Sequence, residues 1–206
     1  MPKLATALFL LVFIAAACAP SPSGSSTLVP TALPPTTEPS SAAPAATTAP
    51  TEIPQQVVDQ PVWFSLPLID ARTGETFTLG DFSGKLVFVE PMATWCTNCR
   101  AQMRNLVAAR QQLNNPNIVY IGLSVETTLA RGDLAGYADT HGFDWTFAVM
   151  TPEIVSALTD TFGRSVTVPP SSPHFLIYPD GSLSPLSAGG IESTSELVQL
   201  LTEAAA

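Results

Sequence analysis

The residues of this sequence best suited to chemistry are two cysteines separated by two residues. Cys96 and Cys99 lie in the segment ATWCTNCRAQ, directly after an apolar run and at the start of a segment with helical spacing. The N-terminus of a helix offers free backbone N–H groups and a partial positive charge, which favour the thiolate form of Cys96 over the thiol. Lowering a thiol pKa from about 8.5 to about 7 raises the thiolate fraction at neutral pH from a few per cent to about half. The pair therefore indicates a nucleophilic, redox-active site.

Metal-binding and purely structural interpretations of this pair are weaker. A structural zinc site usually needs four Cys or His ligands, and the only other candidates after residue 57 are His141 and His174, at no recognised finger spacing. A disulfide that closes so short a loop stabilises a fold only a little. We therefore expect a redox couple of Cys96 and Cys99 and no metal site. Copper binding by the two cysteines, with His174 as a candidate further ligand, stays open as an alternative function, since thiolates are soft ligands.

The first residues of the chain have the layout of an export signal. In residues 1–17, Lys3 is followed by the apolar run LATALFLLVFI and then by small residues up to Cys18. This run is too short to anchor the chain across a bilayer, so we predict a signal peptide rather than a membrane span. The segment IAAAC also resembles the lipobox of bacterial lipoproteins, which implies that Cys18 is lipidated. An ordinary cleavage after Ala17, which would leave a free thiol, is the less favoured alternative.

The composition divides the remaining chain into a tether and a domain. Residues 18–56 are almost entirely Pro, Ser, Thr, Ala and Gly, a composition that buries too little apolar surface to offset its conformational entropy. Residues 57–206 have the length of a single domain and contain enough apolar residues for a core. The formal net charge of −9 argues against nucleic acid as a ligand.

Apolar runs alternate with segments of helical periodicity along this domain. Runs of consecutive apolar residues predict buried strands, whereas apolar residues three and four positions apart predict helices. The opening segment and the tail have instead the turn residues of β-hairpins. We predict strands at 85–92, 117–125 and 145–150, helices at 97–115, 129–142, 152–163 and from about residue 194, and hairpins at 62–79 and 174–187. This order predicts an α/β fold with a mixed central sheet flanked by helices.

Several segments resemble the thioredoxin fold, and within it the exported thiol-disulfide oxidoreductases of the TlpA/ResA type. FSGKLVFVEPMATWCTNCR resembles the central strand and the W-C-x-x-C-R signature of this family, FSLPLIDARTGETFTL its N-terminal β-hairpin, and the stretch between IGLSVE and WTFAV its central insertion. SSPHFLIYPDG resembles the strand that begins at the family's cis-proline. The resemblance implies a thioredoxin-like fold in which Pro173, preceded by Ser172, faces the cysteines and binds a substrate chain near Cys96. It also implies that Trp95 forms part of the substrate-facing wall.

The position of the proton acceptor departs from the family pattern. Many exported members carry a Glu three residues after the second cysteine, where this chain has Gln102, whereas thioredoxin carries a buried acid six residues before the first cysteine, where this chain has Glu90. We infer that Glu90 accepts the proton of Cys99, because an acid inside an apolar strand is costly without a function. The alternative is that Glu90 is a buried structural residue with its hydrogen bonds satisfied, or that it faces water at the end of the strand. For His174, which follows the proline, packing is favoured over a catalytic or metal-binding role.

Together these features predict a lipid-anchored protein thiol-disulfide oxidoreductase, tethered to the extracytoplasmic face of the cell membrane. The resemblance favours a reductase of client protein disulfides, such as those of apocytochrome in cytochrome c maturation or of metal-site cysteines, with electrons from a membrane thiol donor. Thr97 and Asn98, between the cysteines, add no cation that would make the disulfide strongly oxidising. We expect no cofactor and no nucleic-acid partner. Peroxide reduction is disfavoured because the Thr-x-x-Cys context of peroxiredoxins is absent from the sequence.

Overall fold

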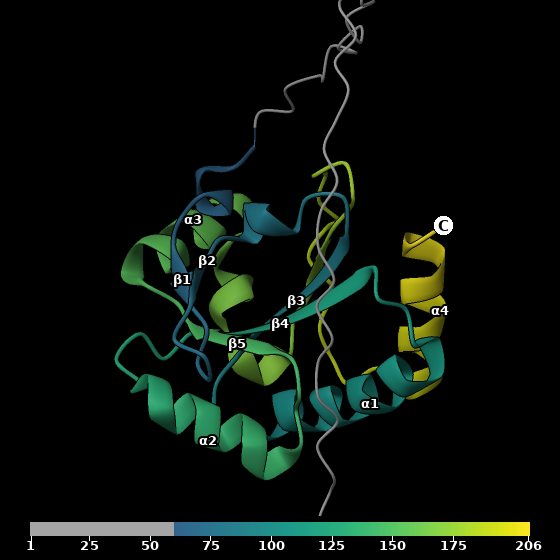
Figure 1. The fold of residues 1–206 in the computed structure, drawn as a ribbon, viewed down its shortest axis with the longest axis horizontal. Helices are drawn as coiled ribbons and strands as arrows, with labels where there is room; N and C mark the ends of the chain where they lie inside the picture. The colour runs from purple at the N-terminus through teal and green to yellow at the C-terminus, as the bar shows by residue number, and fades with distance from the viewer. Residues whose placement is uncertain (1–59) are drawn as a thin grey trace, which may run out of the picture. The chain divides into compact units, whose positions relative to one another are not determined.

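The computed structural model describes residues 60–206, drawn in colour in Figure 1. The predicted signal peptide, Cys18 and the tether lie outside the described residues, so the domain boundaries after residues 17 and 56 stay predictions. Within 60–206, no helix combines the length and the apolar character that a membrane span requires.

A four-stranded sheet in the order β5-β4-β3-β6 forms the centre of the domain. Its strands are β3 (Leu86–Met92), β4 (Ile118–Ser124), β5 (Thr146–Val149) and β6 (Phe175–Ile177). The first three strands are parallel, and β6 runs antiparallel to β3. Every residue of β3 is buried, which explains why its sequence is continuously apolar except for one acid. The predicted mixed sheet is therefore confirmed.

Helices cover both faces of this sheet (Figure 1). The helices on one face are α1 (Thr97–Leu113), α2 (Arg131–His141) and α4 (Thr194–Ala204), and the helix on the other face is α3 (Pro152–Phe162). Local caps set several of the helix ends: the Ser193 side chain accepts a backbone N–H at the start of α4, and Gly142 ends α2 in a left-handed conformation. The predicted helices are thus confirmed.

The opening hairpin is shorter than the sequence predicted. Strands β1 (Leu68–Ile69) and β2 (Thr76–Phe77) pair antiparallel, but the segment before them forms the 3₁₀ helix η1 (Val62–Phe64) instead of a strand. The reason is that Trp63 and Phe64 are neighbours in the chain and are both buried in the same cluster. Successive side chains of a strand would point to opposite faces.

The predicted C-terminal hairpin is also reduced. β6 forms its first arm, and the return arm contributes only an isolated bridge between Ile177 and Leu183. Next to this bridge the Leu176 N–H is bound by the Oγ of Ser184 at 2.8 Å instead of by its carbonyl oxygen, so the regular ladder does not continue.

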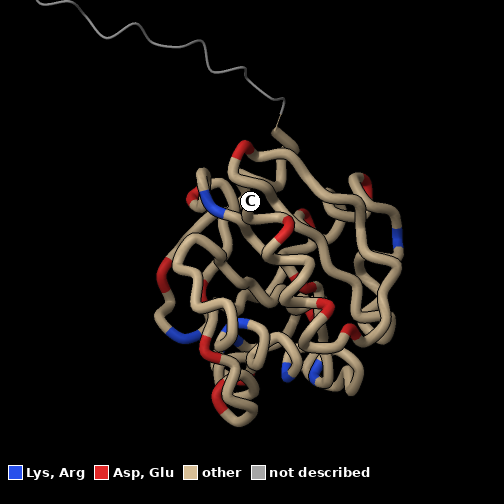
Figure 2. Tube along the Cα trace, turned by 90° about the vertical axis from the view of Figure 1, so that its right-hand side faces the viewer, with Lys and Arg blue, Asp and Glu red and all other residues tan. Residues whose placement is uncertain are grey.

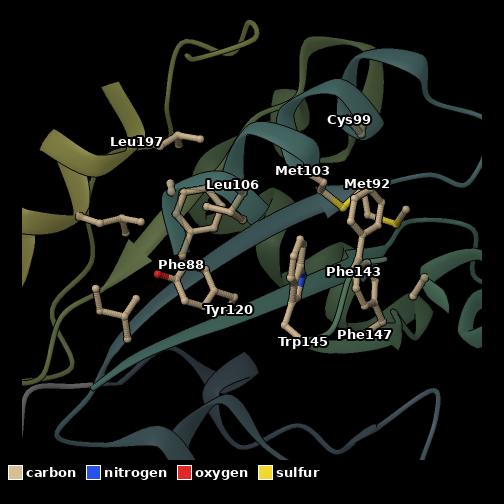
Figure 3. Packing of buried hydrophobic residues seen from close by; sticks show 14 of the residues in the cluster. Phe88, Met92, Cys99, Met103, Leu106, Tyr120, Phe143, Trp145, Phe147 and Leu197 are labelled. Carbon is tan, nitrogen blue, oxygen red and sulfur yellow. The ribbon is translucent and has the colours of Figure 1, made fainter. Parts of the chain in front are cut away.

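The core on the α1 side of the sheet leads directly to the cysteines (Figure 3). Phe88 and Met92 of β3 and Met103 of α1 are buried in one cluster that also contains both cysteines. Burial of each such apolar side chain contributes about 1.5–3 kcal/mol to the stability of the fold. Because side chains alternate along a strand, Glu90 shares the face of Phe88 and Met92. The acid of β3 therefore points into the apolar layer between the sheet and α1.

Charged positions are spread around the domain. Figure 2 shows acidic positions along the whole outline of the trace and fewer basic ones. The chain has 17 Asp and Glu residues against 8 Lys and Arg residues, and an excess of this sign repels polyanions such as nucleic acids.

Candidate active site

Cys96 and Cys99 are joined in a disulfide at the first turn of α1, with their Cα atoms 5.4 Å apart. Cys96 is the N-cap residue of the helix, and its Sγ accepts a hydrogen bond from the backbone N–H of Cys99 at 3.0 Å. In the reduced pair, a thiolate at Cys96 would receive this N–H group together with the positive end of the helix dipole. The local structure therefore favours Cys96 as the nucleophile.

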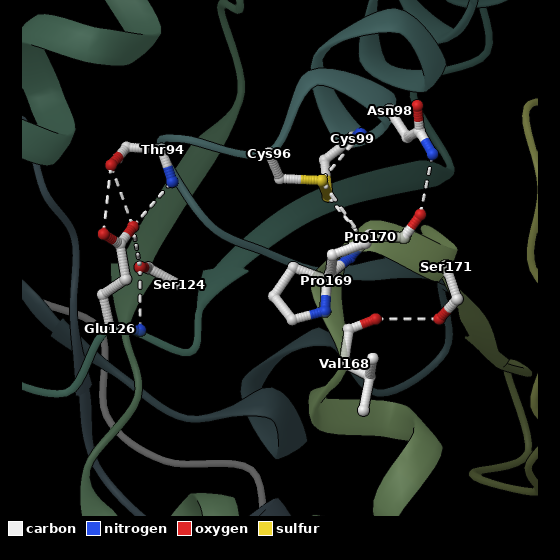
Figure 4. The surroundings of a disulfide bond; sticks show 10 residues. All are labelled: Thr94, Cys96, Asn98, Cys99, Ser124, Glu126, Val168, Pro169, Pro170 and Ser171. Atoms are coloured by element: carbon white, nitrogen blue, oxygen red, sulfur yellow. Dashed lines mark hydrogen bonds between the residues drawn. A yellow bond between two sulfur atoms is a disulfide. The ribbon is translucent and has the colours of Figure 1, made fainter.

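A short turn of chain covers the disulfide (Figure 4). In η4 (Pro169–Ser171), the carbonyl oxygen of Pro169 lies 3.2 Å from Cys96 Sγ and 3.0 Å from Cys99 Sγ. Asn98 donates from Nδ2 to another carbonyl oxygen of this turn at 2.8 Å. The sulfurs of a disulfide carry no hydrogen, so the Pro169 contacts are close approaches that can become S–H···O hydrogen bonds once the pair is reduced. Both cysteines are consequently buried, with 1% and 0% of their surface exposed.

The exposed apolar surface of the site comes from residues beside the disulfide. Trp95 keeps 61% of its surface exposed, and Val168 keeps 48%. Trp95 precedes Cys96, and Val168 precedes Pro169, whose carbonyl touches both sulfurs. Both residues thus add exposed apolar surface next to residues that touch or form the disulfide. The role of Trp95 as a substrate-facing wall agrees with this exposure and stays a prediction.

Glu126 holds the loop that leads into the disulfide (Figure 4). It lies two residues after β4, and its Oε2 accepts hydrogen bonds from the Thr94 backbone N–H at 2.6 Å and from Thr94 Oγ1 at 2.9 Å. The Oγ of Ser124 donates to the same oxygen at 3.4 Å. Glu126 was not among the site residues predicted from the sequence. Its position directly after a predicted strand could have pointed to it, because the carboxyl ends of parallel strands meet at one edge of a sheet.

Glu90 is buried in β3, with 2% of its surface exposed. Among the residues that the structure describes, neither of its carboxylate oxygens has a hydrogen-bond partner. Burial and, to a smaller extent, the charge of Glu192 raise the pKa of Glu90 well above its usual value. A carboxyl group of this kind exchanges its proton at a less acidic pH than an exposed glutamate does. The position fits the predicted proton acceptor, and that role stays a prediction.

A polar cluster lies on the same side of the sheet, built around Glu192 in the loop before α4. Gln102 holds this residue at two points: Gln102 Nε2 donates to Glu192 Oε2 at 2.8 Å, and Gln102 Oε1 accepts the Glu192 backbone N–H at 2.7 Å. Nδ1 of His174 lies 3.4 Å from the same carboxylate oxygen, and the His174 ring stacks on Phe88. Burial lowers the pKa of His174, and the charge of Glu192 opposes this shift. Gln102 and His174 stand out in the sequence, whereas no sequence pattern distinguishes Glu192, which was not predicted.

The predicted substrate-binding segment needs one correction. The peptide bond before Pro173 is trans, since residues 60–206 contain no cis peptide bond, so the expectation of a cis-proline was wrong. Ser172 has a left-handed backbone (φ 47°, ψ 53°), and this conformation turns the chain toward β6. Both residues are buried, and the carbonyl that touches the sulfurs belongs to Pro169. Substrate binding at Ser172 and Pro173 stays a prediction.

Comparison with known proteins gives a family and a fold. Residues 57–182 match the model of the AhpC/TSA family. A thiol:disulfide interchange protein of the thioredoxin family from Chlorobium tepidum TLS is 20% identical, with 68% of this chain and 93% of that chain covered and a TM-score of 0.58. A secreted disulfide oxidoreductase from Mycobacterium tuberculosis, described as homologous to E. coli DsbE, is 16% identical, with 68% and 96% covered and a TM-score of 0.54. Copper-bound ScoI from Arabidopsis thaliana is 17% identical, with 67% and 94% covered and a TM-score of 0.55.

These likenesses confirm the predicted thioredoxin-like α/β fold. At identities of 20% or less, the likeness to solved structures concerns the fold. Taken with the family match and the disulfide at the first turn of α1, it supports a thiol-disulfide oxidoreductase, as the sequence predicted.

Proposed function

Since this chain belongs to the AhpC/TSA family, we propose that it is a protein thiol-disulfide oxidoreductase with Cys96 and Cys99 as its redox couple. The observation that carries the proposal is the position of the disulfide at the N-terminus of α1, where Cys96 Sγ accepts the N–H of Cys99. This hydrogen bond and the helix dipole stabilise the Cys96 thiolate, which is the form that attacks disulfides.

The reduced pair transfers two electrons to a client disulfide in two steps. The Cys96 thiolate attacks one client sulfur, so a mixed disulfide forms while the client S–S bond breaks and releases a client thiolate. Cys99 then gives its proton to Glu90 and attacks Cys96 Sγ, which releases the second client thiolate and forms the Cys96–Cys99 disulfide. The two client thiolates take up protons from solvent. The client is thereby reduced and the protein oxidised.

We expect the pair to act as a reductase. Thr97 and Asn98 carry no positive charge that would stabilise a thiolate further, and a couple with a less stabilised reduced form is less oxidising. Equilibration of the full chain in thiol redox buffers measures the potential: a value near about −270 mV supports a reductase, and one near about −120 mV identifies an oxidant instead.

The order of attack is tested by trapping. In Cys99→Ser, attack by Cys96 continues but resolution is lost, so mixed disulfides with client proteins accumulate. In Cys96→Ser, no mixed disulfide forms. Electrophoresis of both full-length variants without reductant, after an acid quench, counts the trapped species. Equal trapping by the two variants would contradict the assigned order.

The proposed place of action is the extracytoplasmic face of the cell membrane, with lipid on Cys18 and residues 18–56 as the tether. The signal-like residues 1–17 support this proposal, and one protein of the same fold is described as secreted. The clients would be oxidised cysteines of apocytochrome or of metal sites, and the electrons would come from a membrane thiol donor. Cys18→Ala should move the protein from the membrane to the soluble fraction. Retention of this variant at the membrane would contradict the lipid anchor.

Copper binding by the same cysteines is the second candidate function, supported by the shared fold of copper-bound ScoI. In the described part of the chain, no three His, Cys, Asp or Glu side chains come together in a way that could hold a metal ion. Copper would therefore be bound by two thiolates after reduction of the disulfide. Anaerobic titration of the reduced full chain with Cu(I) separates the candidates: tight binding that both cysteines require, without client trapping by Cys99→Ser, would favour the metallochaperone.

A further inference from the structure

Four elements of the fold surround the position of Glu90. α1 carries Cys99, which lies in the same buried cluster as Phe88 and Met92, the residues that share the face of Glu90 on β3; in the proposed function Glu90 receives its proton. β4 contributes Gly122, which is opposite Glu90 in the parallel register and does not titrate. α2 contributes Tyr137, whose pKa is raised to about 12 by burial, so its hydroxyl keeps its proton at neutral pH. None of these groups carries a charge that could adjust Glu90 at neutral pH.

The fourth element is the chain that enters β6, together with the loop before α4. Val89 pairs with Phe175, so the register continued by one residue puts His174 opposite Glu90. His174 stacks on Phe88, which shares the face of Glu90, and its Nδ1 approaches Glu192. After burial, the negative charge of Glu192 is the second cause that raises the pKa of Glu90.

Glu192 is held in place although it is partly exposed. The side chain of Glu192 has 32% of its surface exposed. A carboxylate with this exposure ordinarily moves freely. Gln102 binds both its carboxylate and its backbone N–H, and Asn105 Nδ2 donates to its carbonyl oxygen at 2.6 Å. Three hydrogen bonds with α1 therefore hold Glu192, one of them to its carboxylate and two to its backbone.

We propose that Glu192, Gln102 and His174 form a positioning unit that acts through Glu90: Gln102 fixes the Glu192 carboxylate, whose negative charge makes Glu90 a stronger base for the Cys99 proton. The proposal rests on the proposed function. Like charges that share a low-dielectric region disfavour each other, so a nearby carboxylate increases the affinity of Glu90 for a proton. His174 is kept neutral by burial, and a neutral imidazole leaves the charge of Glu192 uncancelled.

The experiment follows the two thiol releases when the reduced full chain reacts with the aromatic disulfide 5,5′-dithiobis(2-nitrobenzoate) in a stopped-flow instrument. The first coloured thiolate reports attack by Cys96, and the second reports resolution by Cys99. In Glu192→Gln, we expect the pH profile of the second release to move to lower pH and its plateau to fall about threefold to tenfold, because a weaker base accepts the proton less well. The first release should not change.

Matched variants separate this mechanism from a structural effect. Glu203→Gln removes an exposed carboxylate of α4 that accepts a hydrogen bond from Gln199, and it should leave both releases unchanged. In a Glu90→Gln background, Glu192→Gln should have no further effect on resolution. Gln102→Met, which frees the Glu192 carboxylate, should shift the pH profile in the same direction by a smaller amount.

An unchanged pH profile in Glu192→Gln would overturn the proposal, as would an equal slowing with and without Glu90. If Glu90→Gln alone left resolution unchanged, the base would be another group and the positioning unit would have nothing to act on. The oxidoreductase function would survive either result as long as two thiolates are released and both releases require Cys96.

Discussion

Two glutamates near the disulfide end of the sheet, Glu90 in β3 and Glu126 just after β4, have opposite surroundings. Glu126, after β4, is partly buried and accepts hydrogen bonds from Thr94 and Ser124. Glu90, in β3, is fully enclosed and accepts none among the described residues. Hydrogen bonds to a charged group stabilise a fold by about 1.5–3 kcal/mol each, whereas an unpaired buried ion costs several kcal/mol. The fold therefore uses Glu126 to hold the active-site loop and leaves Glu90 ready to gain or lose a proton.

The largest expected effect on the reaction comes from replacement of Glu90. Glu90→Gln keeps the shape of the side chain but cannot accept a proton, so we expect resolution by Cys99 to slow by about 10²-fold or more. The first attack by Cys96 should keep its rate. The two releases of thiolate from an aromatic disulfide measure both steps, and Glu126→Gln serves as the comparison. A resolution rate within about twofold of the wild type would identify Glu90 as a structural residue and leave the base to be found elsewhere.

The same substitution should change the pH dependence of stability. The pKa of Glu90 is raised in the folded chain, first by burial and then by the charge of Glu192, from the usual value of 4.5. The native state therefore binds a proton that the unfolded chain releases above about that pH, and stability falls as the pH rises through the folded pKa. Glu90→Gln should match the wild type in melting temperature near pH 4 and exceed it increasingly at higher pH. An advantage that is constant with pH would rule out the titration of Glu90 as its cause.

The features that could be predicted from the sequence are those that local patterns encode. The continuous apolar run of β3 and the helical spacing after Cys96 depend on residues close in the chain, and both elements lie where they were predicted. The cysteine pair was identified for the same reason. Glu90 stood out because a single acid interrupts that apolar run.

The missed features depend on contacts between distant segments. Glu192 touches Gln102 across 90 positions of the chain, and Glu126 touches Thr94 across 32. Neither acid interrupts a pattern, since both lie in polar loops where a glutamate is ordinary. The turn that covers the disulfide was likewise hidden, because the contact of Pro169 with both sulfurs depends on the tertiary path of the chain before β6. Sequence therefore revealed the reacting atoms, and the structure was needed for the residues that hold them.

Removal of the Glu126 carboxylate, which has hydrogen-bond partners, should lower the stability of the domain rather than its reaction rates. Glu126→Ala leaves the Thr94 N–H without its acceptor and should destabilise the domain by about 1–3 kcal/mol. For a domain of this size that loss lowers the melting temperature by several degrees. Calorimetry of the full-length variant measures it, with Glu203→Ala as the control for loss of an exposed carboxylate. A melting temperature equal to that of the control would mean that the loop is held by other contacts.

The smallest effect should come from Thr94, which donates the hydrogen bonds that Glu126 accepts. Thr94→Val removes the hydroxyl that donates to Glu126 at 2.9 Å but keeps the backbone N–H that donates at 2.6 Å. Valine has nearly the same shape as threonine, so the expected loss is that of one hydrogen bond, about 0.5–1.5 kcal/mol. Because the two residues share one contact, the double variant Thr94→Val with Glu126→Ala should be less destabilised than the sum of the two single variants. If Thr94→Val instead lowered the free energy of unfolding as much as Glu126→Ala does, the hydroxyl rather than the backbone N–H would hold the loop. The contrast between Glu126 and Glu90 would then be smaller than their hydrogen bonds indicate.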